Sequence, residues 1–270
     1  MVHKPDNVKS ISELLTLNIN EISQQAKGRD SCLVMLNHPF WQYYDVLPQD
    51  VFYCPEIRFF EVQGGSGAVF KAYPQAESYI PEKFWDVVNA HRSLKDEPLL
   101  FGVASDDAHF YDAQRISGRG GVNNGWIMVR SLELSAPALL AAMNRGDFYA
   151  TTGVFLRDLT FNKKTRALRL ALQTEPGVAY RIHFITTRRG FNQTVSEITV
   201  PAEDQRPERR VPICSDEVGQ TVLTVEGTEA VYHMTDSDLY VRARVESDRP
   251  CVYSGNFQPE FQAAWTQPQT

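Results

Sequence analysis

Residues 99–109 have the sequence LLFGVASDDAH, an apolar run that ends in two aspartates and a histidine. Such a short continuous apolar run is typical of a strand buried on both faces of a parallel sheet. Two earlier runs of this kind are CLVML at 32–36 and IRFFEV at 57–62, and helical patterns occur at 10–27 and 81–94. Strands separated by helix-length patterns predict βαβ units, and therefore a parallel sheet or barrel.

The chain changes character after about residue 124. Segments that alternate apolar and polar residues, such as ALRLAL at 167–172 and YVRARV at 240–245, follow at hairpin spacing. This alternation is typical of antiparallel strands with one buried face. We therefore predict an α/β domain over residues 1–124 and an all-β, sandwich-like domain over residues 125–270.

Composition and charge exclude several classes of protein. Hydrophobic residues make up 43% and charged residues 22% of the chain, which excludes wholesale disorder. Residues 1–112 hold 9 Lys and Arg against 16 Asp and Glu, and the rest holds 18 against 17, so no nucleic-acid partner is expected. No apolar run is long enough for a membrane span. The first ten residues lack the apolar core of a signal peptide, so a cytoplasmic location is the default unless a signal lies upstream.

The predicted parallel strands end in side chains that can bind a metal ion. His38 follows the first strand, and Glu61 lies near the end of the second. Asp107 and His109 follow the third strand and, being two apart, leave an extended backbone on the same side. Carboxyl ends of parallel strands meet at one edge, where ligands collect. Imidazole and carboxylate are the usual ligands of Zn, Mn and Fe, so the sequence predicts a divalent metal site there.

Each of these residues also has an ordinary structural interpretation. A histidine before proline often lies in a loop, and turns favour aspartate. Glu61 is equally consistent with a salt-bridged strand end. The shared placement at strand ends is what favours a site. The other histidines of the body of the chain, His91, His183 and His233, are expected to be structural or exposed.

Three motifs resemble the last metal-binding motifs of the PHP (polymerase and histidinol phosphatase) superfamily of metal-dependent phosphoesterases. They are LNHP at 36–39, FEV at 60–62 and GVASDDAH at 102–109. GWIMV at 125–129 and RGDFYATTG at 145–153 are similar to a subgroup in which a β-sandwich follows the barrel. The resemblance implies the C-terminal part of a distorted (β/α)7 barrel followed by a sandwich. It also implies hydrolysis of a phosphoester by metal-activated water.

The resemblance assigns roles to individual residues. It implies that His38, Asp107 and His109 bind the divalent metal. The residues that it places around the metal ligands are Asn37, Glu61, Asp106 and Arg119. Asp106 would orient a ligand, and Arg119 would meet the phosphate of a phosphorylated small molecule.

One part of the superfamily pattern is absent. The sequence contains no His-X-His pair, and His3 is the only histidine before His38. Three ligands would hold one metal ion weakly and could not build a cluster of several metals. The chain is therefore expected to be truncated at its N-terminus and weakly active or inactive alone. A homodimer partner or the missing N-terminal segment is expected to cover the open sheet edge.

Two other functions stay open. A non-catalytic binding or scaffold protein would keep a degenerate metal site and use its β-sandwich to recognise a sugar or a protein. A self-contained zinc hydrolase would use His38, Asp107 and His109, which is the number of protein ligands that catalytic zinc requires. Substitution of Asp107 and His109 distinguishes the hydrolase from the binding protein.

Overall fold

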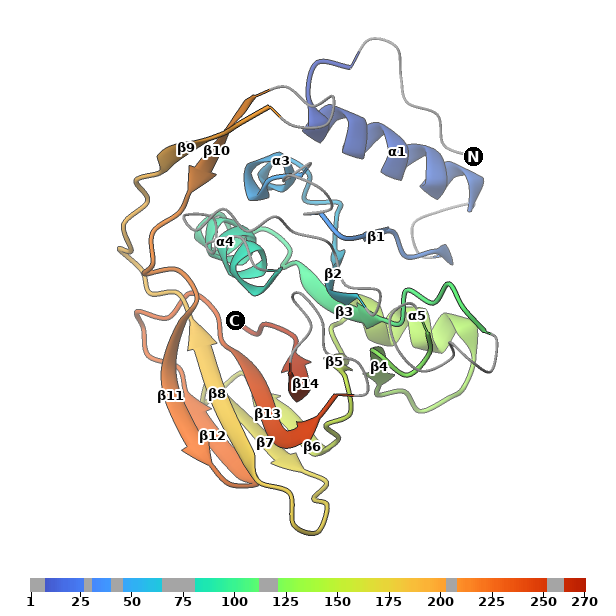
Figure 1. Cartoon of the computed structure of the whole chain (residues 1–270), viewed down its shortest axis with the longest axis vertical. Helices are drawn as coiled ribbons and strands as arrows, with labels where there is room; N and C mark the ends of the chain where they lie inside the picture. Colours follow the sequence, from blue (N-terminus) through green and yellow to red (C-terminus); the bar gives the residue numbers. More distant parts are fainter. Residues whose placement is uncertain are drawn as a thin grey trace.

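The computed structural model describes residues 8–26, 31–39, 46–64, 81–111, 121–202, 208–251 and 260–270. In this part of the chain, strands account for 38% of the residues and helices for 21%. Helices and a small sheet lie at one end of the molecule, and long antiparallel strands lie at the other (Figure 1). None of the helices in the described ranges combines the length and hydropathy that a membrane span requires.

The first helix, α1 (Ile11–Gln25), begins at a side-chain cap. The hydroxyl of Ser10 accepts a hydrogen bond from the backbone N–H of Glu13 at 3.1 Å, which satisfies one donor of the first helical turn. Farther along the helix, the hydroxyl of Thr16 lies 3.0 Å from Sγ of Cys54. The helix predicted at the N-terminal end is therefore confirmed.

Three parallel strands form the small sheet. They are β1 (Met35–Leu36), β2 (Phe59–Gly64) and β3 (Phe101–Ser105), paired in that order. The short helix α3 (Pro48–Phe52) precedes β2, and α4 (Pro81–Leu94) precedes β3. All three predicted parallel strands are thus present, with their carboxyl ends at one edge of the sheet.

Helix α4 packs closely on this sheet through buried aromatic rings. The Trp85 ring lies 5.7 Å from that of Phe60 on β2, and its Nε1–H donates to the carbonyl of Leu100 at 2.7 Å. A Cβ atom at Gly102 would come within 2.9 Å of the Trp85 ring. Glycine at position 102 is therefore what allows α4 to lie so close to β3.

The other strands are antiparallel, and helix α5 (Ala136–Asn144) separates the first two along the chain. Their bounds are β4 Trp126–Val129, β5 Phe148–Thr151, β6 Leu156–Asn162, β7 Ala167–Leu172, β8 Tyr180–Thr186, β9 Ser196–Val200, β10 Arg209–Ile213, β11 Gln220–Glu226, β12 Glu229–His233, β13 Arg242–Pro250 and β14 Phe261–Thr266. Six strands pair in the order β11-β8-β13-β14-β5-β4, three in the order β12-β7-β6, and β9 pairs with β10.

The prediction of the C-terminal part of a distorted (β/α)7 barrel is wrong. The described chain is mostly β, with several antiparallel sheets, whereas a barrel of this class needs a closed ring of parallel strands. The parallel sheet stops at β3, and the next strands, β4 and β5, pair antiparallel with each other. Strand β5 also pairs with β14, where Ala150 lies opposite Trp265. Partners so distant in sequence cannot be read from local apolar patterns.

The outer edge of β3 is satisfied by a side chain. Oε1 of Gln267 accepts a hydrogen bond from the backbone N–H of Gly102 at 2.8 Å, and its Nε2 donates to the Gly102 carbonyl at 2.8 Å. The amide of Gln267 is itself buried. It therefore occupies the position that a peptide group of a fourth strand would otherwise take.

The apolar cores extend across the predicted boundary after residue 124. One core joins Phe60 and Trp85 of the helical end to Trp265 of β14. Another is shared by the six- and three-stranded sheets and includes Leu170 and Phe184. The division into two domains stays a prediction, and the described residues on its two sides are packed together.

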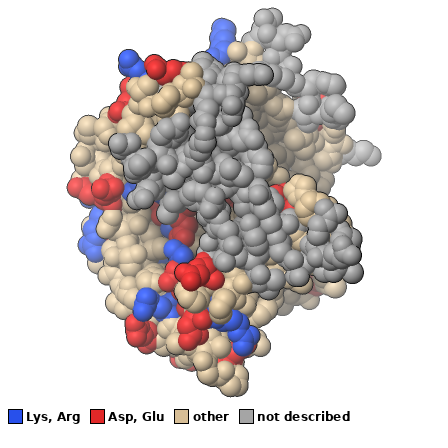
Figure 2. All heavy atoms as spheres, in the orientation of Figure 1, with Lys and Arg blue, Asp and Glu red and all other residues tan. Residues whose placement is uncertain are grey.

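Several charged side chains on the antiparallel sheets form pairs of opposite sign. Arg181 on β8 lies 3.1 Å from Glu226 on β11, and Arg244 lies 2.6 Å from Glu246 on β13. In Figure 2, acidic and basic atoms lie next to one another over the lower part of the molecule. The described residues on that part of this face form no single-sign basic patch.

Candidate functional site

Glu61 links the ends of all three parallel strands. It lies on β2, and the residue is 6% exposed. Oε1 accepts a hydrogen bond from the Ser105 hydroxyl at the end of β3 at 2.6 Å. Oε2 accepts from the backbone N–H of His38, just after β1, at 2.8 Å. One buried carboxylate thus connects the carboxyl ends of β1, β2 and β3, where the sequence predicts the metal site.

The space around this carboxylate depends on a glycine. A Cβ atom at Gly64, the last residue of β2, would come within 2.8 Å of Oε1 of Glu61. Contacts that short are not tolerated, so a side chain at position 64 would displace the carboxylate. Gly64 therefore helps to keep Glu61 between His38 and Ser105.

Two of the predicted metal ligands adopt unusual backbone conformations. His38 has φ 27° and Asp107 has φ 45°, both in the left-handed region. L-residues adopt this region at an energetic cost, and such residues are concentrated at functional sites. Both lie directly beyond the ends of parallel strands. This strain supports a functional interpretation of the edge.

The ring of His109 is fixed in one tautomer. Its Nδ1 lies 2.6 Å from the carbonyl oxygen of Asp107, and because a carbonyl only accepts, Nδ1 carries the proton. In the neutral ring the lone pair is therefore on Nε2, and the residue is exposed. Metal-binding histidines commonly donate their other ring N–H to a carbonyl in this way.

Asp106 fastens the next described segment to the end of β3. Its Oδ1 accepts hydrogen bonds from the backbone N–H groups of Asn124 and Gly125, at 2.7 and 3.0 Å. This oxygen is engaged in holding the backbone. Asp106 thus positions the chain around the edge.

The predicted site is only partly assembled. Glu61 joins His38 to Ser105, and Asp107 lies beside His109, but no three His, Cys, Asp or Glu side chains of the described ranges form a group able to hold a metal ion. The donors are of the right kind for Zn, Mn or Fe, and their present arrangement is not a complete coordination site. Asn37 is exposed immediately after β1. The predicted phosphate-binding residue, Arg119, lies outside the described residues.

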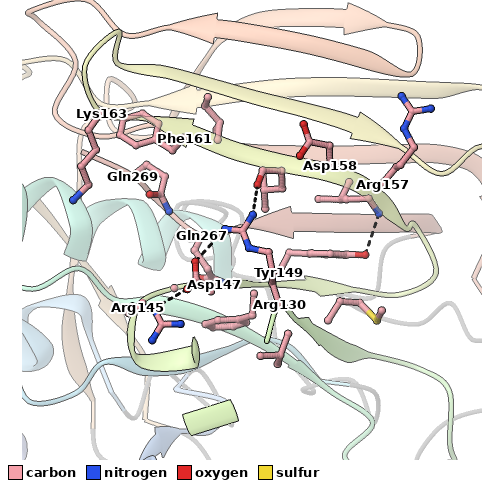
Figure 3. A pocket seen from close by; sticks show the side chains of 17 residues that line it. Arg130, Arg145, Asp147, Tyr149, Arg157, Asp158, Phe161, Lys163, Gln267 and Gln269 are labelled. Carbon is pink, nitrogen blue, oxygen red and sulfur yellow. Dashed lines mark hydrogen bonds and ion pairs between the residues drawn. The ribbon is translucent and has the colours of Figure 1, made fainter. Parts of the chain in front are cut away.

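A pocket of about 750 Å³ lies elsewhere, among β4, β5, β6 and the C-terminal segment (Figure 3). It lies in the size range of small-molecule sites. Its lining includes Arg130, Arg145, Asp147 and Lys163. This pocket was not predicted from the sequence, and the RGDFYATTG stretch at 145–153, which contributes Arg145 and Asp147 to its lining, was given no chemical role.

Comparisons of the chain with protein-family models, with curated proteins and with solved structures give no match.

Proposed function

We propose that the edge formed by the ends of β1, β2 and β3 belongs to a metal-dependent phosphoesterase, similar to the PHP superfamily. In this proposal His38, Asp107 and His109 bind one divalent cation. The observation that carries it is the pair of hydrogen bonds by which Glu61 holds the His38 backbone and the Ser105 hydroxyl at one edge.

The residues of the edge divide into ligands and positioning groups. The lone pair on Nε2 of His109 and the Asp107 carboxylate are donors suited to Zn, Mn or Fe. Glu61 and Asp106 use carboxylate oxygens to hold backbone N–H groups, so they position the loops. A divalent cation at this edge would supply the Lewis acidity that activates water for attack on a phosphoester.

The proposal expects weak metal binding and little turnover by the chain alone. The described residues do not present a complete set of ligands, so binding must reorganise the loops that carry His38 and Asp107. Reorganisation of this kind lowers the measured affinity.

Calorimetric titration of the full chain with Mn²⁺ and with Zn²⁺ tests the proposal. Asp107→Asn and His109→Gln should each weaken binding by more than about tenfold. The matched controls are Asp96→Asn, an exposed aspartate with φ 54°, and the exposed His233→Gln. Equal affinities in all four variants and the unchanged chain would overturn the proposal, provided that circular dichroism shows intact folds.

One observation favours a second candidate, a non-catalytic binding protein. No three His, Cys, Asp or Glu side chains in the described ranges form a group able to hold a metal ion, as expected if the strand ends have a purely structural role. This alternative predicts no specific metal binding and recognition of a sugar or a protein by the antiparallel sheets. Absence of Mn²⁺ and Zn²⁺ binding to the unchanged chain would favour it.

A further inference from the structure

We propose that the pocket among β4, β5, β6 and the C-terminal segment binds a small organic anion, a carboxylate or phosphate group carried on an apolar body. The inference is independent of the strand-end edge, because the pocket contains none of His38, Glu61, Asp107 or His109. It rests on the charge of the lining, on the way its arginines are held, and on its apolar wall.

The lining is positive although the chain is negative. Its cations are Arg130, Arg145, Arg157 and Lys163, and its acids are Asp147 and Asp158. Four positive charges less two negative charges leave +2 among the lining residues, or +1 when Arg157, which pairs with Glu229 outside the pocket, is set aside, in a chain whose formal net charge is −6. A hollow lined by an excess of one sign concentrates ligands of the opposite sign.

One carboxylate orients two arginines. Asp147 accepts from Nη2 of Arg130 at 3.1 Å and from Nε of Arg145 at 2.8 Å. Nη1 of Arg130 also donates to the carbonyl of Leu159 on β6 at 2.8 Å, so its guanidinium crosses the pocket, as Figure 3 shows. Because a single negative charge is shared by two positive ones, the trio stays cationic, and Asp147 orients both guanidinium groups toward itself.

Donors remain for a ligand. Within the described ranges, the terminal nitrogens of Arg145 make no hydrogen bond or ion pair, and Lys163 has no ion-pair partner. Arg157, in contrast, is paired with Glu229 outside the pocket. Arg145 and Lys163 are therefore the cations that an incoming anion would engage.

One part of the wall is apolar, while Tyr149, Gln267 and Gln269 add polar groups. Phe161 and Leu168, from β6 and β7, line the pocket together with Val129 of β4. Figure 3 shows Phe161 near Lys163. A wall that combines cations with an aromatic ring favours an anion attached to an apolar or aromatic group over an inorganic ion.

Phenyl phosphate and benzoate are suitable probes, with benzyl alcohol as the neutral analogue. The full chain is titrated with each probe and followed by NMR, with EDTA present so that metal at the strand ends does not contribute. At least one anion should bind saturably, with a dissociation constant at or below about 5 mM. Preference for one probe identifies the anionic group. Benzyl alcohol should not saturate.

Arg145→Gln and Lys163→Gln should each weaken binding of the preferred anion about tenfold. The control is Arg181→Gln, an exposed arginine on β8 outside the pocket, which should leave the affinity unchanged. The second pocket variant keeps the test decisive if the first misfolds. No saturable binding of either anion, equal affinity for benzyl alcohol, or equal affinity in all three variants would overturn the proposal.

Discussion

Arg242 on β13 and Asp86 on α4 form a buried ion pair with two hydrogen bonds, Nη2 to Oδ2 at 2.6 Å and Nε to Oδ1 at 2.8 Å. Nη1 of Arg242 also donates to Oε2 of Glu82 at 2.8 Å, and its guanidinium lies 4.9 Å from the centre of the Trp85 ring. Arg242 is 1% exposed. The helical end of the molecule is therefore fastened to the six-stranded sheet through buried charges.

Loss of the arginine should be strongly destabilising. Arg242→Met leaves the carboxylates of Glu82 and Asp86 buried without their main partner, so the free energy of unfolding should fall by about 3–5 kcal/mol. Urea denaturation measures the change. Arg181→Met, which breaks an exposed pair with Glu226, should change it by less than about 1 kcal/mol. Equal losses in the two variants would contradict a special role for Arg242.

The same cluster should make the protein sensitive to acid. Burial by itself raises the pKa of Glu82, but the charges of Arg242 and Arg244 outweigh it and hold the pKa below its usual value of 4.5. The folded state therefore binds the proton less tightly than the unfolded state. The resulting stability is present above the unfolded pKa and is lost as pH falls through the folded pKa.

We expect the contribution of Glu82 to the free energy of unfolding to be constant near neutral pH and to fall below about pH 4.5. In Glu82→Gln the fall should be shallower, because this titration is removed. Urea denaturation over a pH series checks the slope, and an identical slope in both proteins would show that other groups cause the acid sensitivity.

The contribution of the Gln267 amide to stability can be tested by replacing glutamine with a side chain of similar size. Gln267→Met removes both hydrogen bonds to Gly102 and leaves a buried N–H and C=O unsatisfied, which should cost about 2–4 kcal/mol of stability. The exposed Gln173→Met serves as the control and should be nearly neutral. Thermal and urea unfolding of both variants measure the difference. A loss no greater than that of the control would mean that water satisfies these groups.

Two glycines separate backbone strain from steric overlap. Gly219 has φ 70° and Gly177 has φ 75°, so alanine costs about 1–2 kcal/mol of backbone strain at either position. A Cβ atom at Gly219 would also overlap the Asp86 carboxylate, whereas nothing lies within 4 Å of one at Gly177. Gly219→Ala should therefore lose about 1–3 kcal/mol more than Gly177→Ala in urea denaturation. Equal losses of stability in the two variants would show that Asp86 can move away from the added Cβ atom without an energetic cost.

Local signals in the sequence were sufficient for several elements. The helical patterns at 10–27 and 81–94 correspond to α1 and α4, which are both present. The buried strands β2 and β3 follow the apolar runs. Strand β5 was not predicted, because all four of its residues are buried and it shows no alternation. One of its two partners, β14, lies far away in sequence, and such distant antiparallel pairing is also why the barrel prediction failed.

The candidate site was predictable only in outline. Strand order brings Glu61 between His38 and Ser105, as the shared edge of parallel strands requires. The orientation of the His38 and Asp107 side chains depends on the left-handed backbone conformation of these two residues, which the sequence does not predict. The pocket near Arg145 was missed because its walls come from strands that meet only in the folded chain.

The amide of Gln267 determines on which side the parallel sheet could accept another strand. A further strand could pair with β3 only if the buried side chain of Gln267 first gave up both hydrogen bonds to Gly102. Among the described strands, β1 is at the opposite border and has β2 as its single neighbour. A further strand, from this chain or from a second copy, would therefore pair with β1 at Met35 and Leu36.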